Sequence, residues 1–328
     1  MRTPGQSASL GGFPIALRRS VLRQFLSGDG TSIGPMPRKF RFVWLDVFAK
    51  APLEGNQLAV FPDARGLTED EMQSIARETH LSETTFVFPE DDAVDLERGF
   101  ATRIFAVLGE MPFAGHPTLG TASVLSRLKG RTEVALRLQV GRIPVRFSEK
   151  EGLPFGEMVQ NDPEIGATHD PPAVARALNV PREALDPKLP IQTVSTGVPF
   201  AIVPFRSLKV LSEIRPVWTV MEEYLRGTDA KFFYLLSRET TDRSAGAHAR
   251  MIFAGGEDPA TGSAAGPAIA WMVLHGLVPP EEPVMIEQGV EVFRRSRLYA
   301  RSGLREGRPV NVRVGGHCVP VIHGELEL

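Results

Sequence analysis

The chain has 328 residues, of which 42% are hydrophobic and 23% are charged, a composition typical of a globular protein long enough for two compact cores. A formal net charge of −2 excludes the broad basic surface that nucleic acids or acidic membranes require, and no apolar stretch reaches the roughly 18 residues of a membrane-spanning helix. The single cysteine, Cys318, excludes an internal disulfide framework and a cysteine-based zinc cage, and it fits a reducing compartment. We therefore expect a soluble, cytoplasmic protein whose partner is a small molecule, with no nucleic acid and no membrane.

Residues 1–38 differ in composition from the rest of the chain. They contain five arginines and one acidic residue, Asp29, together with many Gly, Ser and Pro residues. A short basic helix with one apolar face would suit an organelle transit peptide, whereas an upstream start codon would make Met36 the functional start. We expect an N-terminal extension that is either not native or disordered, and it has no place in the predicted fold.

After residue 40 the sequence alternates strand signals with turn signals. Eleven short runs rich in β-branched and aromatic residues predict strands. These runs cover residues 42–49, 57–61, 84–88, 101–107, 133–140, 143–147, 191–195, 200–205, 231–237, 249–254 and 311–314. Helical periodicity appears in three segments: 68–80, with Thr68 as its N-cap, about 116–129, and about 261–275, ended by Gly276. Strands outnumber helices, which favours the α+β class.

Two pairs of similar segments indicate that the chain consists of two related halves. HPTLGTA at 116–122 is similar to DPATGSA at 258–264, an offset of 258 − 116 = 142 residues. GNQLAVFP at 55–62 is similar to GVPFAIVP at 197–204, again with an offset of 197 − 55 = 142. A shared offset predicts an internal duplication.

The two long apolar helices lie far apart in the sequence, so each is expected at the centre of its own strand-rich half. A cluster of Pro and Asp at 161–190 marks the crossing between the halves. We expect one domain at 39–160 and a second at 161–309. The C-terminal strand region, at about 310–328, is expected to return to the first domain.

Both apolar helices begin in segments without large side chains, GHPTLG at 115–120 and TGSAA at 261–265. Helix-start N–H groups carry partial positive charge, and small residues let an anion approach them closely. If the halves face each other, the two starts form a cradle for a carboxylate. Alternatively, the small residues only permit close helix packing, with Asp258 as an N-cap. A phosphate loop is disfavoured because its lysine is missing.

Three side chains near these segments are candidates for proton transfer. His116 and Asp258 occupy corresponding places in the repeat, one at each end of the predicted cleft. Glu83 interrupts a strand start in HLSETTFVF, where apolar neighbours would raise the pKa of its carboxyl toward the range of a general base. Each has an ordinary structural alternative, because His116 can cap or pack a helix and Glu83 can be solvated at a strand edge.

The motifs LSETTFV (81–87), EMPFAGHPTLGTA (110–122) and GEDPATGSAAG (256–266), in this order and spacing, resemble the phenazine-biosynthesis PhzF-like isomerase family, a branch of the diaminopimelate epimerase-like fold. The resemblance covers residues 40–328. It implies two similar domains, each a barrel-like, mostly antiparallel sheet around a central helix, with the active site between them. It also implies a homodimer and catalysis with neither a metal nor an organic cofactor.

Position by position, the resemblance assigns roles to six residues. The general base matches Glu83, the helper at the first helix start matches His116, and the acid at the second matches Asp258. Positions that hold the substrate carboxylate match Gly115, Gly262 and Ser263. The cysteines of related epimerases fall at small residues around Ala114 and Ala260, which excludes a two-thiol mechanism. Ala106–Gly109 and Gln57 depart from the family pattern, so the substrate stays undetermined.

The resulting hypothesis is a cofactor-independent isomerase that moves a proton on a small carboxylate-bearing substrate by general acid/base catalysis. Two alternatives stay open: a racemase or epimerase with opposed acid/base residues, and a non-catalytic carboxylate-binding protein. A metal enzyme is disfavoured because the pair formed by His317 and His323 lacks a nearby third ligand.

Overall fold

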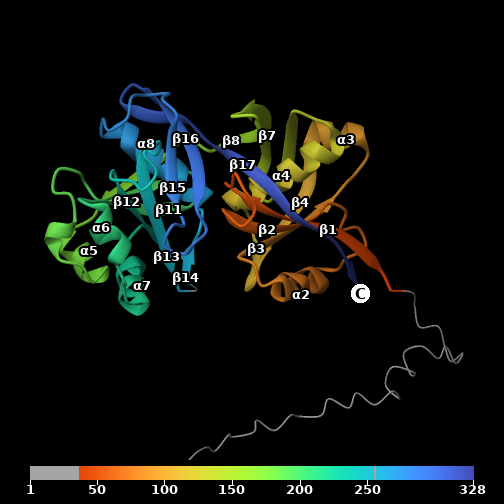
Figure 1. Ribbon diagram of the computed structural model, residues 1–328, viewed down its shortest axis with the longest axis horizontal. Coiled ribbons are helices and arrows are strands. Elements are labelled where there is room, and N and C mark those ends of the chain that lie inside the picture. The colour runs from red at the N-terminus through yellow and green to blue at the C-terminus, as the bar shows by residue number, and fades with distance from the viewer. Residues whose placement is uncertain (1–36, 255) are drawn as a thin grey trace, which may run out of the picture. The chain divides into compact units, whose positions relative to one another are not determined.

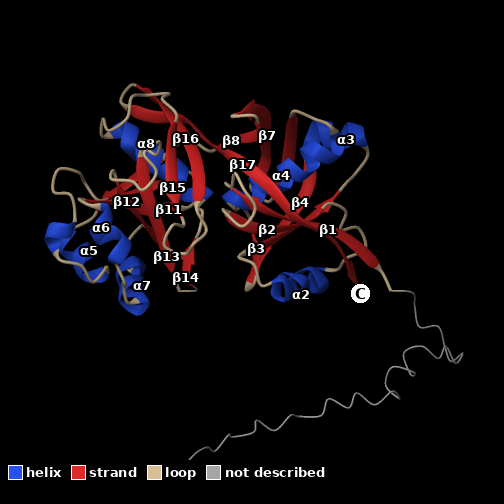
Figure 2. Cartoon of the chain, viewed as in Figure 1, coloured by secondary structure: helices blue, strands red, loops and turns tan. Residues whose placement is uncertain are grey.

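Figure 1 shows the computed structural model, which describes residues 37–254 and 256–328. Residues Lys39–Glu327 form one compact unit in which strands predominate (Figure 2). The N-terminal extension predicted for residues 1–38 lies outside the described residues except for its last two, so it stays a prediction. No helix in the described part of the chain is both long and apolar enough to span a bilayer.

Eight strands form a closed ring in which β2 pairs with β3, and β4 with β6, in parallel, while all other neighbours are antiparallel. The antiparallel pairs are β1–β2, β3–β4, β6–β7, β7–β8, β8–β17 and β17–β1. Closure leaves no free strand edge. A short strand, β5 (Gly109–Met111), folds back on β4 as a hairpin. The ring strands are β1 (Lys39–Val47), β2 (Asn56–Phe61), β3 (Glu83–Phe88), β4 (Phe100–Ala106), β6 (Glu133–Leu138), β7 (Gly141–Lys150), β8 (Leu153–Val159) and β17 (Arg308–Glu327).

A second run of strands repeats this pairing order. β11 pairs with β12, and β13 with β15, in parallel, and the pairs β9–β10, β10–β11, β12–β13, β15–β16 and β16–β17 are antiparallel. β14 (Gly256–Asp258) folds back on β13 as β5 does on β4. The strand β17 belongs to both runs, because it pairs with β16 through its first part and with β1 through its last part. The remaining bounds are β9 (Glu164–Thr168), β10 (Gln192–Ser195), β11 (Pro199–Phe205), β12 (Phe232–Ser237), β13 (Ala247–Phe253), β15 (Val284–Gln288) and β16 (Ser296–Arg305).

Each run of strands packs around one buried helix. Helix α4 (Gly115–Lys129) is buried from Gly115 to Leu125, and α8 (Gly262–Leu274) is buried from Ala264 to Val273. Over these turns neither helix has the polar face of a surface helix, because sheet encloses it. Their side chains join those of the strands in one apolar core that includes Leu119 and Trp271. The predicted fold class, α+β with two similar domains that each consist of a barrel-like sheet around a central helix, is confirmed.

Shorter helices lie outside the two sheets. Helix α2 (Glu69–Thr79) begins as predicted with Thr68, in a capping box where the Glu71 amide donates to Thr68 Oγ1 and the Thr68 amide donates to the Glu71 carboxylate. The others are too short for their periodicity to be recognised in the sequence. They are α3 (Asp92–Arg98), α5 (Pro171–Ala177), the 3₁₀ helix Arg182–Ala184, α6 (Leu208–Glu213) and α7 (Trp218–Arg226).

The structure corrects the predicted alignment of the two helix starts. Helices α4 and α8 begin 262 − 115 = 147 residues apart, whereas the similar sequence segments are 142 residues apart. The expectation that His116 and Asp258 occupy corresponding places is therefore wrong. His116 is the second residue of α4, whereas Asp258 ends β14 and precedes α8 by four residues. Repeats of Gly, Pro and Ala align at several nearby offsets, so the motif alone does not determine the helix start.

Candidate active site

The starts of the two buried helices meet, as the sequence predicts. A β-carbon at Gly115 would lie 2.8 Å from the backbone nitrogen of Ser263 and 2.9 Å from the carbonyl carbon of Gly262. A β-carbon at Gly262 would in turn lie 3.0 Å from the Phe48 ring. The first N–H groups of both helices have no intrahelical acceptor, and both helix dipoles place partial positive charge here. The arrangement suits a small anion.

Glu83 lies at the start of β3, opposite Ala106 of β4. Only 14% of its side chain is exposed, and within the described residues its Oε2 atom has no hydrogen-bond partner. Burial, reinforced by the negative charge of Asp258, raises the pKa of the Glu83 carboxyl to about 8. The predicted pKa rise is thus present. At neutral pH most of this carboxyl is protonated.

His116 faces Glu83 from the first turn of α4. Its Nε2 atom lies 3.3 Å from Glu83 Oε2, and the imidazole is 5% exposed. Burial lowers the pKa of His116 to about 3, because a charged imidazolium would lose its hydration. A neutral imidazole and a neutral carboxyl therefore face each other at rest.

Asp258 reaches the site from the second run of strands. Its Oδ1 atom accepts hydrogen bonds from Asn56 Nδ2 (2.6 Å) and the Ala260 amide (3.4 Å), and its Oδ2 atom accepts from Thr261 Oγ1 (2.6 Å). Burial raises the pKa of the Asp258 carboxyl to about 6, although these hydrogen bonds oppose the rise. The N-cap of α8 is Thr261, so the alternative that Asp258 caps this helix is wrong.

The structure thus brings all six predicted residues together. Glu83 and His116 are in contact, Gly115 abuts Gly262 and Ser263, and Asp258 joins the group through hydrogen bonds. No group of three or more His, Cys, Asp or Glu side chains in residues 37–254 and 256–328 is arranged to hold a metal ion.

Two residues that the sequence interpretation did not single out complete the site. Asn56, the first residue of β2, contacts His116, Asp258 and the Ala260 carbonyl. Gln288, at the end of β15, donates to the Asp258 carbonyl (2.7 Å) and to Thr261 Oγ1 (2.9 Å), which fixes the approach to α8. Asn56 could have been found in the sequence as a polar residue that lies between a glycine and an apolar strand, as in GNQLAVF.

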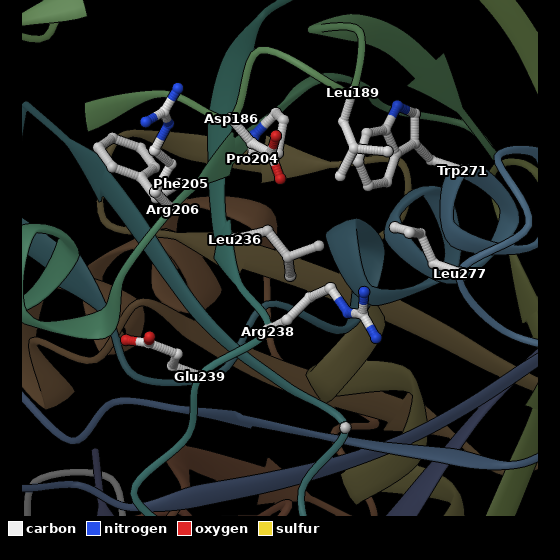
Figure 3. Close-up of a pocket in the computed structure, with 11 residues that line it drawn as sticks. Asp186, Leu189, Pro204, Phe205, Arg206, Leu236, Arg238, Glu239, Trp271 and Leu277 are labelled. Carbon is white, nitrogen blue, oxygen red and sulfur yellow. The ribbon is translucent and has the colours of Figure 1, made fainter. Parts of the chain in front are cut away.

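A cavity of about 310 Å³ lies elsewhere in the second run of strands (Figure 3). Leu236, Leu277 and Trp271 form apolar parts of its wall, and Arg206 and Arg238 also line it. Trp271 stands nine residues after the start of α8, or roughly 13 Å along the helix. None of the six predicted site residues lines this cavity, so it is separate from the candidate active site.

The raised pKa of Glu83 makes a prediction about stability. In the unfolded chain this carboxyl ionises near pH 4.5, whereas in the folded protein it keeps its proton up to about pH 8. Its contribution to stability is therefore full below the lower value and is lost as pH rises through the higher one. The side chain of Glu83→Gln cannot ionise. We therefore expect the melting temperature of this variant, measured relative to that of the wild type, to be higher at about pH 9 than at about pH 5. Scanning fluorimetry at both pH values measures the gain, and an unchanged difference would contradict the burial argument.

Two runs of strands around buried helices, whose starts meet beside a buried carboxyl and imidazole, define a protein of the diaminopimelate epimerase-like fold class. A family model described as phenazine biosynthesis-like protein matches residues 45–324. The chain belongs to this family, also called the PhzF family.

Individual relatives agree with this assignment. The chain is 36% identical over 301 residues to an uncharacterised isomerase of Mesorhizobium japonicum, covering 87% of this chain and 98% of the relative. It is 33% identical over 288 residues to the trans-2,3-dihydro-3-hydroxyanthranilate isomerase of Pseudomonas chlororaphis, covering 88% and 99%. The crystal structure of a PhzF-family phenazine biosynthesis protein from Bacillus anthracis superposes with a TM-score of 0.79 at 26% identity, covering 89% of this chain and all of that one.

Proposed function

We propose that this protein is a cofactor-independent isomerase that moves a proton between two carbons of a small carboxylate-bearing substrate. One observation carries the proposal: Glu83 is a buried carboxyl whose Oε2 atom has no hydrogen-bond partner among the described residues and lies 3.3 Å from His116, at one of two glycine helix starts that face each other. A weakly acidic carbon needs a base close to it and positive charge to stabilise the enolate-like transition state. Glu83 and the helix-start amides supply these two functions without an added group.

In the proposed reaction the substrate carboxylate binds the N–H groups at Gly115 and Gly262 together with the Ser263 hydroxyl. The ionised Glu83 carboxylate takes a proton from a carbon conjugated to that carboxylate, the double bond shifts, and Glu83 returns the proton to another carbon of the same molecule. Substrate and product then have the same composition, and Glu83 ends each cycle as it began. His116 contacts Glu83 throughout, and Asp258 contributes a fixed negative charge near it.

Relatives named trans-2,3-dihydro-3-hydroxyanthranilate isomerases support a substrate of that chemical class, a partly unsaturated ring with amino, hydroxyl and carboxylate groups. The positions that differ from the family pattern, Ala106–Gly109 and Gln57, are close to Glu83 and Asn56 in the sheet. We propose that they set the preference among such carboxylates. The assignment of a cytoplasmic homodimer is a further part of the proposal and depends on the family resemblance.

The racemase alternative needs a second base on the opposite side of one carbon. Asp258 is poorly suited to that task, because Asn56 and Thr261 occupy both of its carboxylate oxygens with 2.6 Å hydrogen bonds. A hydrogen-bonded carboxylate of this kind is better suited to hold other groups in place. The contacts of Asp258 therefore count against a racemase in which Asp258 is the second base, and the isotope experiment below distinguishes a racemase that uses His116 instead.

Incubation with trans-2,3-dihydro-3-hydroxyanthranilate in deuterated water, followed by proton NMR, tests the proposal. We expect a shifted double bond, with deuterium at the carbon that receives the proton to the extent that Glu83 exchanges with solvent. Exchange at a stereocentre without a double-bond shift would instead identify a racemase. Binding in a thermal-shift assay with no change in the compound would identify a carboxylate-binding protein. Small cyclic and amino carboxylates extend the same assay to other substrates.

A further inference from the structure

Asn56 lies where the two runs of strands meet in the candidate site. Its Nδ2 atom is 2.6 Å from Asp258 Oδ1, 3.0 Å from the Ala260 carbonyl oxygen and 3.3 Å from His116 Nδ1. Its Oδ1 atom is 3.4 Å from the Ser82 hydroxyl, which donates to it. The side chain is 2% exposed, so solvent does not compete strongly for these contacts.

The orientation of the Asn56 amide follows from its neighbours. The Ala260 carbonyl can only accept a hydrogen bond, and so can an ionised Asp258, so the atom facing both must be the nitrogen. That nitrogen has two hydrogens, and these two acceptors are its nearest partners. The third contact of this nitrogen, His116 Nδ1 at 3.3 Å, is the longest, so the two hydrogens are directed at Asp258 and Ala260 in preference to it.

The same count of donors and acceptors determines which ring nitrogen of His116 carries the proton. The Gln57 backbone favours protonation of the imidazole, as a carbonyl acceptor near a ring nitrogen does, and among the described residues His116 Nε2 has no hydrogen-bond partner. With both Asn56 hydrogens donated elsewhere, Nδ1 can carry the proton of the neutral ring and donate it to this carbonyl. The lone pair then lies on Nε2, the atom 3.3 Å from Glu83 Oε2. A protonated Glu83 can donate to that lone pair.

We propose that Asn56 is a positioning residue that donates both amide hydrogens to Asp258 and Ala260, which holds Asp258 as an acceptor and leaves His116 with its proton on Nδ1 and its lone pair toward Glu83. The inference rests on the proposed function, because it gives Asn56 a role in orienting the proposed base. Under this inference the GNQLAVF segment forms a strand and also takes part in the chemistry of the site.

The backbone around Asn56 is built to hold this position. Gly55 has a φ of 67°, and a β-carbon there would lie 2.3 Å from the Val47 carbonyl oxygen, so only glycine fits the turn. The Gly55 amide donates to the Arg295 carbonyl (3.0 Å). Arg294 donates from Nε to the Gly55 carbonyl (3.0 Å) and from Nη2 to Asp46 (2.6 Å). These bonds connect the turn before Asn56 to the segment after β15.

Nitrogen-15 NMR of the imidazole rings tests the proton position without any substrate. We expect His116, assigned by its loss in His116→Gln, to show a proton on Nδ1 and none on Nε2 at neutral pH. His248 provides an internal contrast, because its two ring nitrogens lie 2.9 Å and 3.0 Å from the carboxylates of Glu287 and Glu291, and both should carry protons. A His116 proton on Nε2 would overturn the inference.

Two variants test the role of Asn56 in turnover. Asn56→Ala removes both donors, and we expect a loss of kcat of about 10²-fold with a smaller change in KM, because misplaced catalytic groups slow the chemical step. Asn56→Asp can donate to Asp258 only while it is protonated. Its activity relative to the wild type should therefore be highest at low pH and fall as pH rises, whereas the ratio for Asn56→Ala should stay level. Asp258, His116 and Glu83 are the titrating neighbours in both variants.

The outcomes separate this inference from the proposed function. If Glu83→Gln is inactive while both Asn56 variants turn over substrate normally, the proposed function stands and the role of Asn56 fails. If Glu83→Gln keeps its activity, the proposed function fails, and the NMR result still decides the proton position. A pH-independent loss of equal size in both Asn56 variants would indicate a purely structural role and would also overturn the inference.

Discussion

Replacing Glu83 with Gln is expected to abolish turnover while leaving the fold and ligand binding intact. The substitution preserves the size of a side chain that is 14% exposed and removes its ability to accept a proton from carbon. A positioned acid/base group contributes about 10²- to 10⁴-fold, so we expect kcat to fall by at least that range. Steady-state kinetics on a proven substrate measure the loss, and a thermal-shift titration with the same compound measures the retained binding.

Glu110→Gln provides a matched control for this prediction. Glu110 is a carboxylate of similar exposure on the short strand β5, which pairs with β4 and not with β3, and its ion-pair partner is Arg103. We expect its activity to stay close to that of the wild type. Near-normal turnover by Glu83→Gln, or an equal loss in both variants, would remove Glu83 from its proposed role.

The architecture around the site was largely predictable because its signals are local. The long apolar helices α4 and α8 contain runs of small and apolar residues over three or more turns, and the strands carry β-branched and aromatic residues. The strands β5, β8, β9, β14, β15 and β16 and the helices α3 and α5 to α7 escaped prediction, because segments of three to ten residues carry too little periodicity. Their positions follow from packing against the sheet, which a single sequence does not display.

The site itself was predictable only to the level of individual motifs. Glu83, His116 and Asp258 each lie in a short segment with a chemical rationale of its own. Their partner Asn56 is 60 residues from His116 and 202 residues from Asp258, so its contacts form only when the two runs of strands have come together. The opposite shifts of the Glu83 and His116 pKa values likewise depend on burial by distant segments. The hydrogen bonds that both carboxylate oxygens of Asp258 accept likewise come from residues that a single motif does not identify as its partners.

Replacing Gly115 with Ala is expected to reduce both stability and turnover. The residue has an ordinary helical backbone, so the new methyl group acts by crowding alone, and its nearest neighbours at 2.8 Å and 2.9 Å are backbone atoms of Ser263 and Gly262. Backbone atoms cannot swing aside as a flexible side chain can, so the two helix starts must separate. We expect a loss of about 1–3 kcal/mol in the free energy of unfolding and about 10²-fold in kcat/KM, because the amides no longer converge on one carboxylate. Urea titration and kinetics measure the two effects.

Gly227→Ala is the matched control, since its β-carbon would meet only the Tyr224 carbonyl at 3.6 Å. Equal behaviour of the two variants would contradict the contact between the two helix starts on which the proposed site depends.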